Sequence, residues 1–479
     1  MPDTSESQLA LVVKQDCGTC RRIEPVIRLL GDHYGQSLQI HVQDDPAFLA
    51  GLAPATLDAD LGYSFRHDIE VVPTLLRFKD GSETDRIVGW DRAAWRQLTG
   101  LADLGSDMPE FQPGCGSLTQ EPGMAERLAL RFGADSLQAR QLEIDEAEDV
   151  MEACFDRGWT DGLPVVPPTP LRVLRMLRAT PRKASDIVGV IPPDNVPCSV
   201  EKVAVNAVLA GCKPEYFPTV LAVVEAALDD RFCMHGLLCT TYFSSPVVIV
   251  NGPEARRIGM NSGVNALGQG NRANATIGRA LQLLIRNVGG GKPGGIDRAT
   301  LGNPGKYSFC FSEDESQPDW PSLAMEQGFQ RDDSVVSLFA GDGVQAFMDQ
   351  QSRQPESLAR SLALSLRSVA HGKLCMMADG LLVLSPEHRR VFRQGGWTKA
   401  EVKAAIIDAL RIPGTAVVRG AGGIAEGMPV ALRDRTLNKF RDGGFHIACA
   451  GGTAGLFSAI IGGWVASGER GSQLVAKKI

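Results

Sequence analysis

The sequence of 479 residues has few aromatic side chains, no long apolar run and no excess of basic charge. Phe, Trp and Tyr make up 6% of the chain. No apolar stretch approaches the ~20 residues that a membrane-spanning helix needs. The net charge of −7 argues against an extended surface for nucleic acid or for an anionic membrane. We therefore expect neither nucleic-acid nor membrane partners.

The start of the chain and the use of cysteine predict a cytoplasmic protein. Residues 1–6 are acidic and polar, unlike a secretory signal. Eleven cysteines, an odd number spread over a long chain, fit a reducing compartment better than a disulfide scaffold. The length allows two to four domains, and 44% hydrophobic with 22% charged residues is typical of a globular protein.

Two of the cysteines form the motif Cys17-Gly18-Thr19-Cys20. It follows an apolar segment expected to be a strand, residues 10–13, and opens a segment with apolar residues at helical spacing, residues 20–30. Cys17 would lie at the helix N-terminus, where free amides and the helix dipole stabilise a thiolate. Cys20, one turn later, is placed to resolve a mixed disulfide. A bare CxxC also occurs in structural and metal sites, but this surrounding pattern favours dithiol redox chemistry.

The elements that follow point to a known superfamily. Residues 38–42 predict a second strand, 71–78 with 85–88 a hairpin, and 92–101 a closing helix. This order, with the CxxC motif and Val71-Val72-Pro73-Thr74, resembles the thioredoxin superfamily over residues 8–103. The resemblance implies a cis peptide bond before Pro73, beside Cys17, where a substrate strand docks. Asp16 stands where the family usually has Trp, and its carboxylate is expected to oppose thiolate formation.

A Pro- and Gly-rich stretch, residues 105–144, is interpreted as a linker between a domain of residues 1–104 and a large domain of residues 145–479. It contains a short expected helix, residues 124–132, and Cys115 between two glycines. Cys115 is either an incidental loop cysteine or an internal thiol partner of Cys17. The run Cys115-Gly116-Ser117 is similar to the U-G-S-C motif of an uncharacterised bacterial (seleno)protein group, with Leu118 in place of the final Cys. That resemblance implies no substrate.

The large domain is expected to have an α/β fold that contains an internal duplication. Residues 161–175 and 379–393 are identical at eight of fifteen aligned positions. Each copy predicts an Asp-Gly turn, a strand, a Pro turn and the start of a helix. Two halves, about 145–320 and 330–479, would then pack about a pseudo-twofold axis with a ligand crevice between them. The alternative is that unrelated strand–turn–helix units look alike.

A Gly-rich segment predicts the substrate site of the large domain. Residues 268–279 lead into a helix expected to be capped by Asn274, and such a helix start is a good anion site. The pattern nominally fits a dinucleotide fingerprint, but no strand precedes it, and an ordinary core connection is the alternative. Residues 313–315 are expected to form a solvated charge run. The residues predicted to hold a small anionic substrate are Asn271, Arg272, Asn274, Arg279, Lys306 and Tyr307.

Signals for other chemistry are weak. Cys233, His235 and Cys239 offer potential metal ligands, but no second CxxC or HxxxH completes a set. No cofactor is therefore predicted beyond the dithiol, and a metal is left open. A Gly-x-Ser-x-Gly elbow is lacking, so a serine hydrolase is not expected.

We predict a thiol-dependent enzyme whose thioredoxin-like domain exchanges electrons with the large domain. A reductase of the thioredoxin-reductase type is the expected electron donor. The alternatives are a non-redox lyase, hydrolase or sulfur transferase whose cysteine the module keeps reduced, or a non-catalytic binding or assembly protein. The reaction and the oligomeric state stay open. The predicted catalytic residues are Cys17 as attacking and Cys20 as resolving thiol, Pro73 beside them, Cys115 as relay followed by Cys310 and Cys449, and Asp161 or Asp379 for proton transfer.

Overall fold

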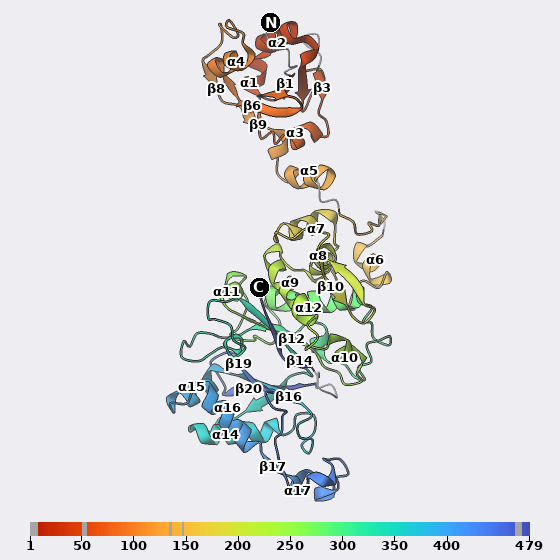
Figure 1. Ribbon diagram of the computed structural model, residues 1–479, viewed down its shortest axis with the longest axis vertical. Helices are drawn as coiled ribbons and strands as arrows, with labels where there is room; N and C mark the ends of the chain where they lie inside the picture. Colours follow the sequence, from red (N-terminus) through yellow and green to blue (C-terminus); the bar gives the residue numbers. More distant parts are fainter. Residues whose placement is uncertain (1–7, 50–54, 134–136, 146–147, 465–471) are drawn as a thin grey trace. The chain divides into compact units, whose positions relative to one another are not determined.

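The computed structural model describes residues 8–49, 55–133, 137–145, 148–464 and 472–479 (Figure 1). The chain divides into two compact units, Met1–Leu137 and Gln138–Ile479, which we describe separately. The first unit includes residues 105–137, which is most of the stretch expected to be a linker.

A five-stranded mixed sheet forms the centre of the first unit. Its strand order is β3-β2-β1-β5-β6, with β1, β2 and β3 parallel and with β5 and β6 antiparallel to their neighbours. Leu11 of β1 pairs with Ile40 on one side and Leu75 on the other, and all three side chains are buried. The strands are β1 (Gln8–Val13), β2 (Leu38–Val42), β3 (Ala55–Leu57), β5 (Thr74–Lys79) and β6 (Ser82–Val88).

The helices of the first unit follow the predicted order, with one division. The helix expected over residues 20–30 is split at Ile23, and Pro25 stands in the first turn of the second part, where a missing amide proton costs little. The helices are α1 (Gly18–Arg22), α2 (Glu24–Tyr34), η1 (Gly35–Ser37), α3 (Gly62–Arg66), α4 (Arg92–Thr99), η2 (Leu118–Gln120) and α5 (Met124–Phe132).

Residues 111–119 pair with two short strands of the first unit, and we call this segment the strap. Two short antiparallel ladders hold it: β8 (Phe111–Gln112) pairs with β7 (Trp90–Asp91), and β9 (Cys115–Gly116) pairs with β4 (Val71–Val72). The strap therefore belongs to the fold of the first unit and does not form a free linker.

An eight-stranded mixed sheet forms the centre of the second unit. β12 runs parallel to β13 and antiparallel to β14, while β16 runs parallel to β19 and antiparallel to β20. The two sets of three strands meet where Gly341 pairs with Gly463. The strands are β12 (Ser245–Asn251), β13 (Cys310–Ser312), β14 (Val335–Gly341), β15 (Gln345–Met348), β16 (Asp379–Leu384), β19 (Phe445–Cys449), β20 (Phe457–Gly463) and β21 (Val475–Lys478).

The predicted duplication stays a prediction. Its second copy forms β16 and the helix after it, but its first copy, residues 161–168, forms no strand. The expected strand in the first copy was therefore wrong. Within the sheet, the strands β13-β12-β14 resemble the strands β19-β16-β20 in order and direction. The two similar sequence segments do not occupy equivalent strands of these two sets.

Helices cover both sets of strands. Figure 1 shows α8, α9 and α12 near β12 and β14, and α14, α15 and α16 near β16, β19 and β20. Most side chains of α8 and α9 are buried. These helices are α8 (Val200–Ala210), α9 (Phe217–Ala227), α12 (Arg272–Asn287), α14 (Pro355–Leu366), α15 (Pro386–Gln394) and α16 (Lys399–Ala409). The shorter elements are α6 (Val150–Asp156), α7 (Pro170–Leu177), β10 (Ile187–Ile191), β11 (Val196–Ser199), η3 (Pro214–Tyr216), α10 (Met234–Cys239), α11 (Pro253–Arg257), η4 (Pro304–Lys306), α13 (Leu323–Glu326), β17 (Ile412–Pro413), α17 (Gly414–Val417), η5 (Ala421–Gly423), η6 (Val430–Leu432) and β18 (Thr436–Leu437).

The expected solvated charge run at residues 313–315 was wrong. Glu313 is 5% exposed, and its carboxylate accepts hydrogen bonds from the Asn251 amide and from the backbone of Leu323 and Cys449. The Nζ of Lys399, also buried, lies 3.9 Å away. Because an isolated buried charge is costly, these partners explain how Glu313 is accommodated between β13 and β19.

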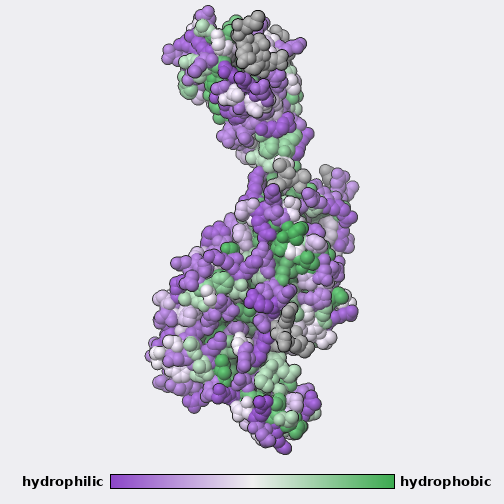
Figure 2. All heavy atoms as spheres, in the orientation of Figure 1, coloured by the Kyte–Doolittle hydropathy of each residue, from purple (hydrophilic) through white to green (hydrophobic). Residues whose placement is uncertain are grey.

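The surface is mixed and mainly hydrophilic. Figure 2 shows an apolar area over the region of β10, where Ile187 and Val190 are exposed. Among the described residues, no helix is both long and apolar enough to span a membrane.

Candidate functional site

Cys17 follows the end of β1 and forms the N-cap of α1. The Asp44 carboxylate holds the turn between them by accepting hydrogen bonds from the amides of Gln15 (2.7 Å) and Asp16 (2.8 Å). Cys17 has extended backbone angles, and its Sγ accepts a hydrogen bond from the Cys20 amide at 3.4 Å. The sequence CxxC thus places both thiols on the same side of the first helical turn, as predicted.

The two thiols of the motif differ strongly in acidity. The hydrogen bond from the Cys20 side chain is the largest cause that lowers the Cys17 pKa, from 9.0 to about 5; the Cys115 side chain and the backbone of Cys20 and Thr19 also lower it, and burial opposes them. Burial, followed by the hydrogen bond to Cys17, raises the pKa of Cys20. Asp16 is not among the main causes of the Cys17 shift. Cys17 is therefore the thiolate at neutral pH, and Cys20 keeps its proton.

Cys115 is the third sulfur of this site. In the β4–β9 ladder it pairs with Val72, whose carbonyl oxygen lies 3.5 Å from the Cys17 Sγ. Its side chain is hydrogen-bonded to Cys17; burial, then that bond, raises the pKa of Cys115. The peptide bond between Val72 and Pro73 is cis, as the resemblance implied. The structure therefore brings Cys17, Cys20, Pro73 and Cys115 together within the first unit.

The strap covers the Cys17 thiol. The Thr19 hydroxyl donates to the carbonyl oxygen of Pro113 at 2.6 Å, and Arg22 donates to the side chain of Gln112 at 3.1 Å. Gly114 is needed for the close approach, because a Cβ there would lie 2.3 Å from Val71 Cγ1 and 2.8 Å from the Val72 oxygen. Only 1% of Cys17 is exposed as a result.

Gln43, which no sequence motif marks, anchors the far end of the strap. Its amide nitrogen donates to the hydroxyls of Ser64 and Ser117, and its oxygen accepts from the Leu118 amide at 3.0 Å. Gln43 follows β2 directly and is 3% exposed. In the sequence, Gln43 is marked only as a polar residue directly after an apolar strand. That position does not reveal its hydrogen bond to Ser117, which lies 74 residues away.

In the second unit, the helix start at α12 differs from the prediction. Asn271, and not Asn274, caps α12: the Asn271 side chain accepts from the Asn274 amide at 3.0 Å. The Asn274 side chain is buried and bonds the backbone of Asn261 and Ala266. The expected Asn274 cap was therefore wrong, and both asparagines hold the Gly-rich loop in place.

Three of the charged residues predicted for the large domain, Arg279, Asp161 and Asp379, form ion pairs within the protein, whereas Arg272 is exposed. Arg279 makes a bidentate ion pair with Asp161, at 2.8 and 2.7 Å. Arg441 makes a similar pair with Asp379, at 2.6 Å for both bonds, and burial raises the pKa of Asp379. Arg272 donates to the carbonyl oxygen of Gly211. These contacts give the side chains a clear role in the fold of the second unit.

Cys310 and Cys449 lie in the core of the second unit. Cys310 is in β13 and Cys449 ends β19, and both thiols are buried. Burial is the first cause that raises the pKa of Cys310, and it raises that of Cys449 to about 12. Both are therefore protonated at neutral pH and poorly placed to exchange disulfides.

Lys306 and Tyr307 line a cavity of about 440 Å³ in the second unit, together with Asp161. Its walls come from α10, the start of β12, the second half of α12 and the loop around η4. The structure thus separates the predicted substrate residues into two groups: Lys306 and Tyr307 at a cavity, and the α12 residues in internal contacts.

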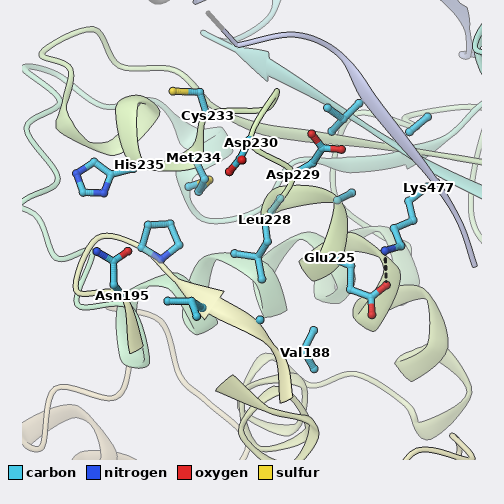
Figure 3. A pocket seen from close by; sticks show the side chains of 17 residues that line it. Val188, Asn195, Glu225, Leu228, Asp229, Asp230, Cys233, Met234, His235 and Lys477 are labelled. Atoms are coloured by element: carbon cyan, nitrogen blue, oxygen red, sulfur yellow. Dashed lines mark ion pairs between the residues drawn. The ribbon is translucent and has the colours of Figure 1, made fainter. Parts of the chain in front are cut away.

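A second cavity, of about 750 Å³, lies between β10, the end of α9, α10 and β21 (Figure 3). Figure 3 shows Cys233 and His235 at its edge, with the His235 ring apart from the Cys233 thiol. Among the described residues, no group of three or more His, Cys, Asp and Glu side chains is placed to hold a metal ion.

Comparisons with known proteins concern the first unit. No protein-family model matches the chain. Thioredoxins from Staphylococcus epidermidis RP62A and from Staphylococcus saprophyticus are each 31% identical over 77 residues, which is 15% of this chain. The chain spans about 60% of the length of these curated relatives.

Two solved structures resemble the same part of the chain. Thioredoxin O2 from Arabidopsis thaliana in the oxidized state is 25% identical, with 20% of this chain and 76% of that chain covered and a TM-score of 0.16. StoA from Bacillus subtilis is 16% identical, with 21% and 84% covered and a TM-score of 0.18. The N-terminal segment has the thioredoxin-like fold predicted from the sequence, and these matches leave the second unit unassigned.

Proposed function

We propose that this protein is a thiol–disulfide oxidoreductase in which the first unit supplies electrons to a reaction of the second unit on a small anionic substrate. The observation that carries the proposal is the convergence of Cys17, Cys20 and Cys115 at one point of the first unit. The 31% identity of this segment to thioredoxins supports a thiol-based redox function for it.

The acidities assign a role to each thiol of the CxxC motif. Cys17, with a pKa of about 5, attacks a disulfide as a thiolate, forms a mixed disulfide and expels one substrate sulfur as a thiolate that takes up a proton. Cys20 then loses its proton and attacks the Cys17 sulfur. This step forms the Cys17–Cys20 disulfide and releases the second substrate thiol. Two electrons pass from the dithiol to the substrate.

Cys115 gives the site a second way to resolve the mixed disulfide. Its side chain contacts the same Cys17 sulfur, so its thiolate can attack there and form a Cys17–Cys115 disulfide with the same balance of electrons. Because Cys115 lies on the strap, this route leaves Cys20 reduced and places one sulfur of the new disulfide on the strap. We assign the relay role to Cys115, since burial disfavours Cys310 and Cys449.

The cycle closes when an external dithiol reduces the protein disulfide. A reductase of the thioredoxin-reductase type is the proposed donor, by analogy with the thioredoxin-like first unit.

A second candidate is a large unit without redox chemistry, a lyase, hydrolase or sulfur transferase whose thiol is merely kept reduced. The burial of Cys310 and Cys449 favours it, since neither core thiol is available for turnover. In this case oxidation of the first unit would not accompany each product molecule.

Single-turnover experiments on the reduced full chain test the proposal. Wild-type protein is expected to reduce one equivalent of a small disulfide such as cystine, with loss of two protein thiols, and Cys17→Ser is expected to lose this reaction. Cys239→Ser serves as the matched control and keeps the first disulfide reduction. Full activity in Cys17→Ser would overturn the redox proposal.

A further inference from the structure

We propose that the cavity beside Lys306 and Tyr307 is a binding site for a small organic monocarboxylate with an apolar body. The cavity measures about 440 Å³, within the range typical of small-molecule sites. The inference deepens the substrate part of the proposed function, and it rests on that function only for the claim that the ligand is a substrate.

Among the described residues, the charges along the cavity leave one cation without a carboxylate partner. Asp161 pairs with Arg279, and Asp297 pairs with Lys306 at 2.7 Å. Arg286 of α12 also lines the cavity, and no described carboxylate pairs with it. Its Nε is buried and has no hydrogen-bond partner among the described residues. One negative charge in the cavity would therefore compensate the charge of Arg286, and a monocarboxylate carries one negative charge.

Two hydroxyl groups supply further donors. Ser244 and Ser245, 1% and 2% exposed, line the same cavity at the start of β12. Neither hydroxyl has a hydrogen-bond partner among the described residues. Because buried polar groups are rarely left unpaired, two such hydroxyls beside an unpaired arginine indicate that a ligand oxygen belongs there.

The rest of the wall is apolar and sets the body of the ligand. Leu237 and Leu238 come from α10, and Ile285 comes from α12. Leu301 and Tyr307 also line the cavity and are 82% and 48% exposed. A bound ligand would cover part of these two large side chains. A carboxylate on an alkyl or aromatic group of modest size matches this division of the wall better than a phosphate or sulfate ion.

The larger cavity of Figure 3 does not fit the same ligand. Its charged groups include the carboxylates of Glu225, Asp229 and Asp230 against the ammonium of Lys477. Glu225 is paired with both Lys477 and Arg182. Asp229 is in turn paired with Arg231, so among the described residues no cation of this cavity is left to compensate an anion, and the monocarboxylate is assigned to the smaller cavity alone.

Calorimetry on the full chain with benzoate, hexanoate, acetate and benzamide tests the site. Benzoate or hexanoate is expected to bind, and benzamide, without the charge, at least about tenfold more weakly. Arg286→Gln should weaken binding about 10- to 100-fold, and the Ser244→Ala/Ser245→Ala pair several-fold. Arg256→Gln, which removes an exposed arginine of α11, is the matched control and should leave affinity unchanged.

Binding that is equal in Arg286→Gln and wild type, or equal for benzoate and benzamide, would overturn the assignment. So would the failure of all three carboxylates to bind below about 10 mM. Circular dichroism confirms that each variant is folded. Cys17→Ser separates the two proposals: it lacks the redox thiol but is expected to bind benzoate as wild type does.

Discussion

Cys115 pairs with Val72 across a two-residue antiparallel ladder, and this register sets its side chain against the sulfur of Cys17. The edge that an incoming strand would use in a thioredoxin-like unit is therefore occupied by the chain itself. Under the proposed function, a disulfide substrate would reach Cys17 only after the strap moves, or would exchange first with Cys115. In both routes the strap would determine how a substrate gains access to the Cys17 thiolate.

Cys115→Ser tests the electrostatic part of this control. The hydrogen bond from Cys115 lowers the Cys17 pKa, and a serine hydroxyl at the same place replaces the thiol contact. We expect the pKa of Cys17 to change measurably, and Cys115→Ala, which removes the donor, to raise it. The pH dependence of iodoacetamide alkylation, with Cys17 identified by mass spectrometry, gives the value. An unchanged midpoint in Cys115→Ala would show that the contact does not stabilise the thiolate.

Cys20→Ser tests the second resolving route. With Cys20 removed, Cys115 is the one remaining thiol in contact with Cys17 among the described residues, so a single turnover should end in a Cys17–Cys115 disulfide. Peptide mapping without reduction detects that link. The double variant Cys20→Ser/Cys115→Ser should instead accumulate the mixed disulfide with substrate. If the single variant also stops at the mixed disulfide, Cys115 does not resolve it.

Gly114→Ala tests whether the strap restricts access. The new Cβ would lie 2.3 Å from Val71 Cγ1, so the β4–β9 ladder must shift. We expect alkylation of Cys17 to become about tenfold faster at a pH well above its pKa, where acidity no longer limits the rate. Gly116→Ala is the matched control, since nothing lies within 4 Å of its Cβ. Equal rates in the two variants would mean that the strap leaves Cys17 accessible.

Much of the first unit could be predicted because its signals are local. The strand at residues 10–13, the CxxC and the hairpin carry clear periodicity and turn residues, and they form β1, the start of α1, and β5 with β6. β3 was missed because all three of its side chains are exposed, which leaves no apolar pattern. The strap was read as a linker because two-residue ladders have no periodicity at all.

The large unit was harder to predict because its site depends on distant partners. The burial of Glu313 depends on partners far along the chain, such as Lys399 and the Cys449 amide, which a local sequence pattern cannot show. Arg279 was expected to bind substrate, but its partner Asp161 is 118 residues away. Arg286 lies in an ordinary helical pattern, and it is distinguished only by its buried Nε, which has no hydrogen-bond partner among the residues that the structure describes.

The depressed Cys17 pKa predicts a pH-dependent stability of the reduced first unit. Between about pH 5 and 9 the unfolded thiol holds a proton that the folded thiolate has lost, so stability rises with pH across this window and is lost as pH falls to 5. The slope is at most about 1.4 kcal/mol per pH unit. In the folded state, burial raises the pKa values of Cys20 and Cys115 above their ordinary value of 9.0, so these two thiols keep their protons in this window.

Pulse proteolysis in urea, with peptides of the first unit quantified under reducing conditions, measures this effect. Relative to Cys17→Ser, the wild-type protein should become steadily more stable from pH 5.5 to 8.5, as the slope above requires. A difference between the two proteins that stays constant over this range would contradict a thiolate in the folded state.

The ion pair of Asp161 and Arg279 is expected to stabilise the second unit more than a surface pair does. The two side chains are 10% and 14% exposed, so removing one leaves the other charge largely buried. Asp161→Asn should lower the unfolding free energy by about 2–4 kcal/mol, and Asp161→Asn/Arg279→Met should recover part of it. Hydrogen exchange of α12 peptides reports the loss locally. Asp319→Asn, from an exposed pair with Arg393, is the control and should change little. If Asp161→Asn is as mild as this control, the pair is not a structural anchor, and Arg279 returns as a candidate for binding the substrate anion.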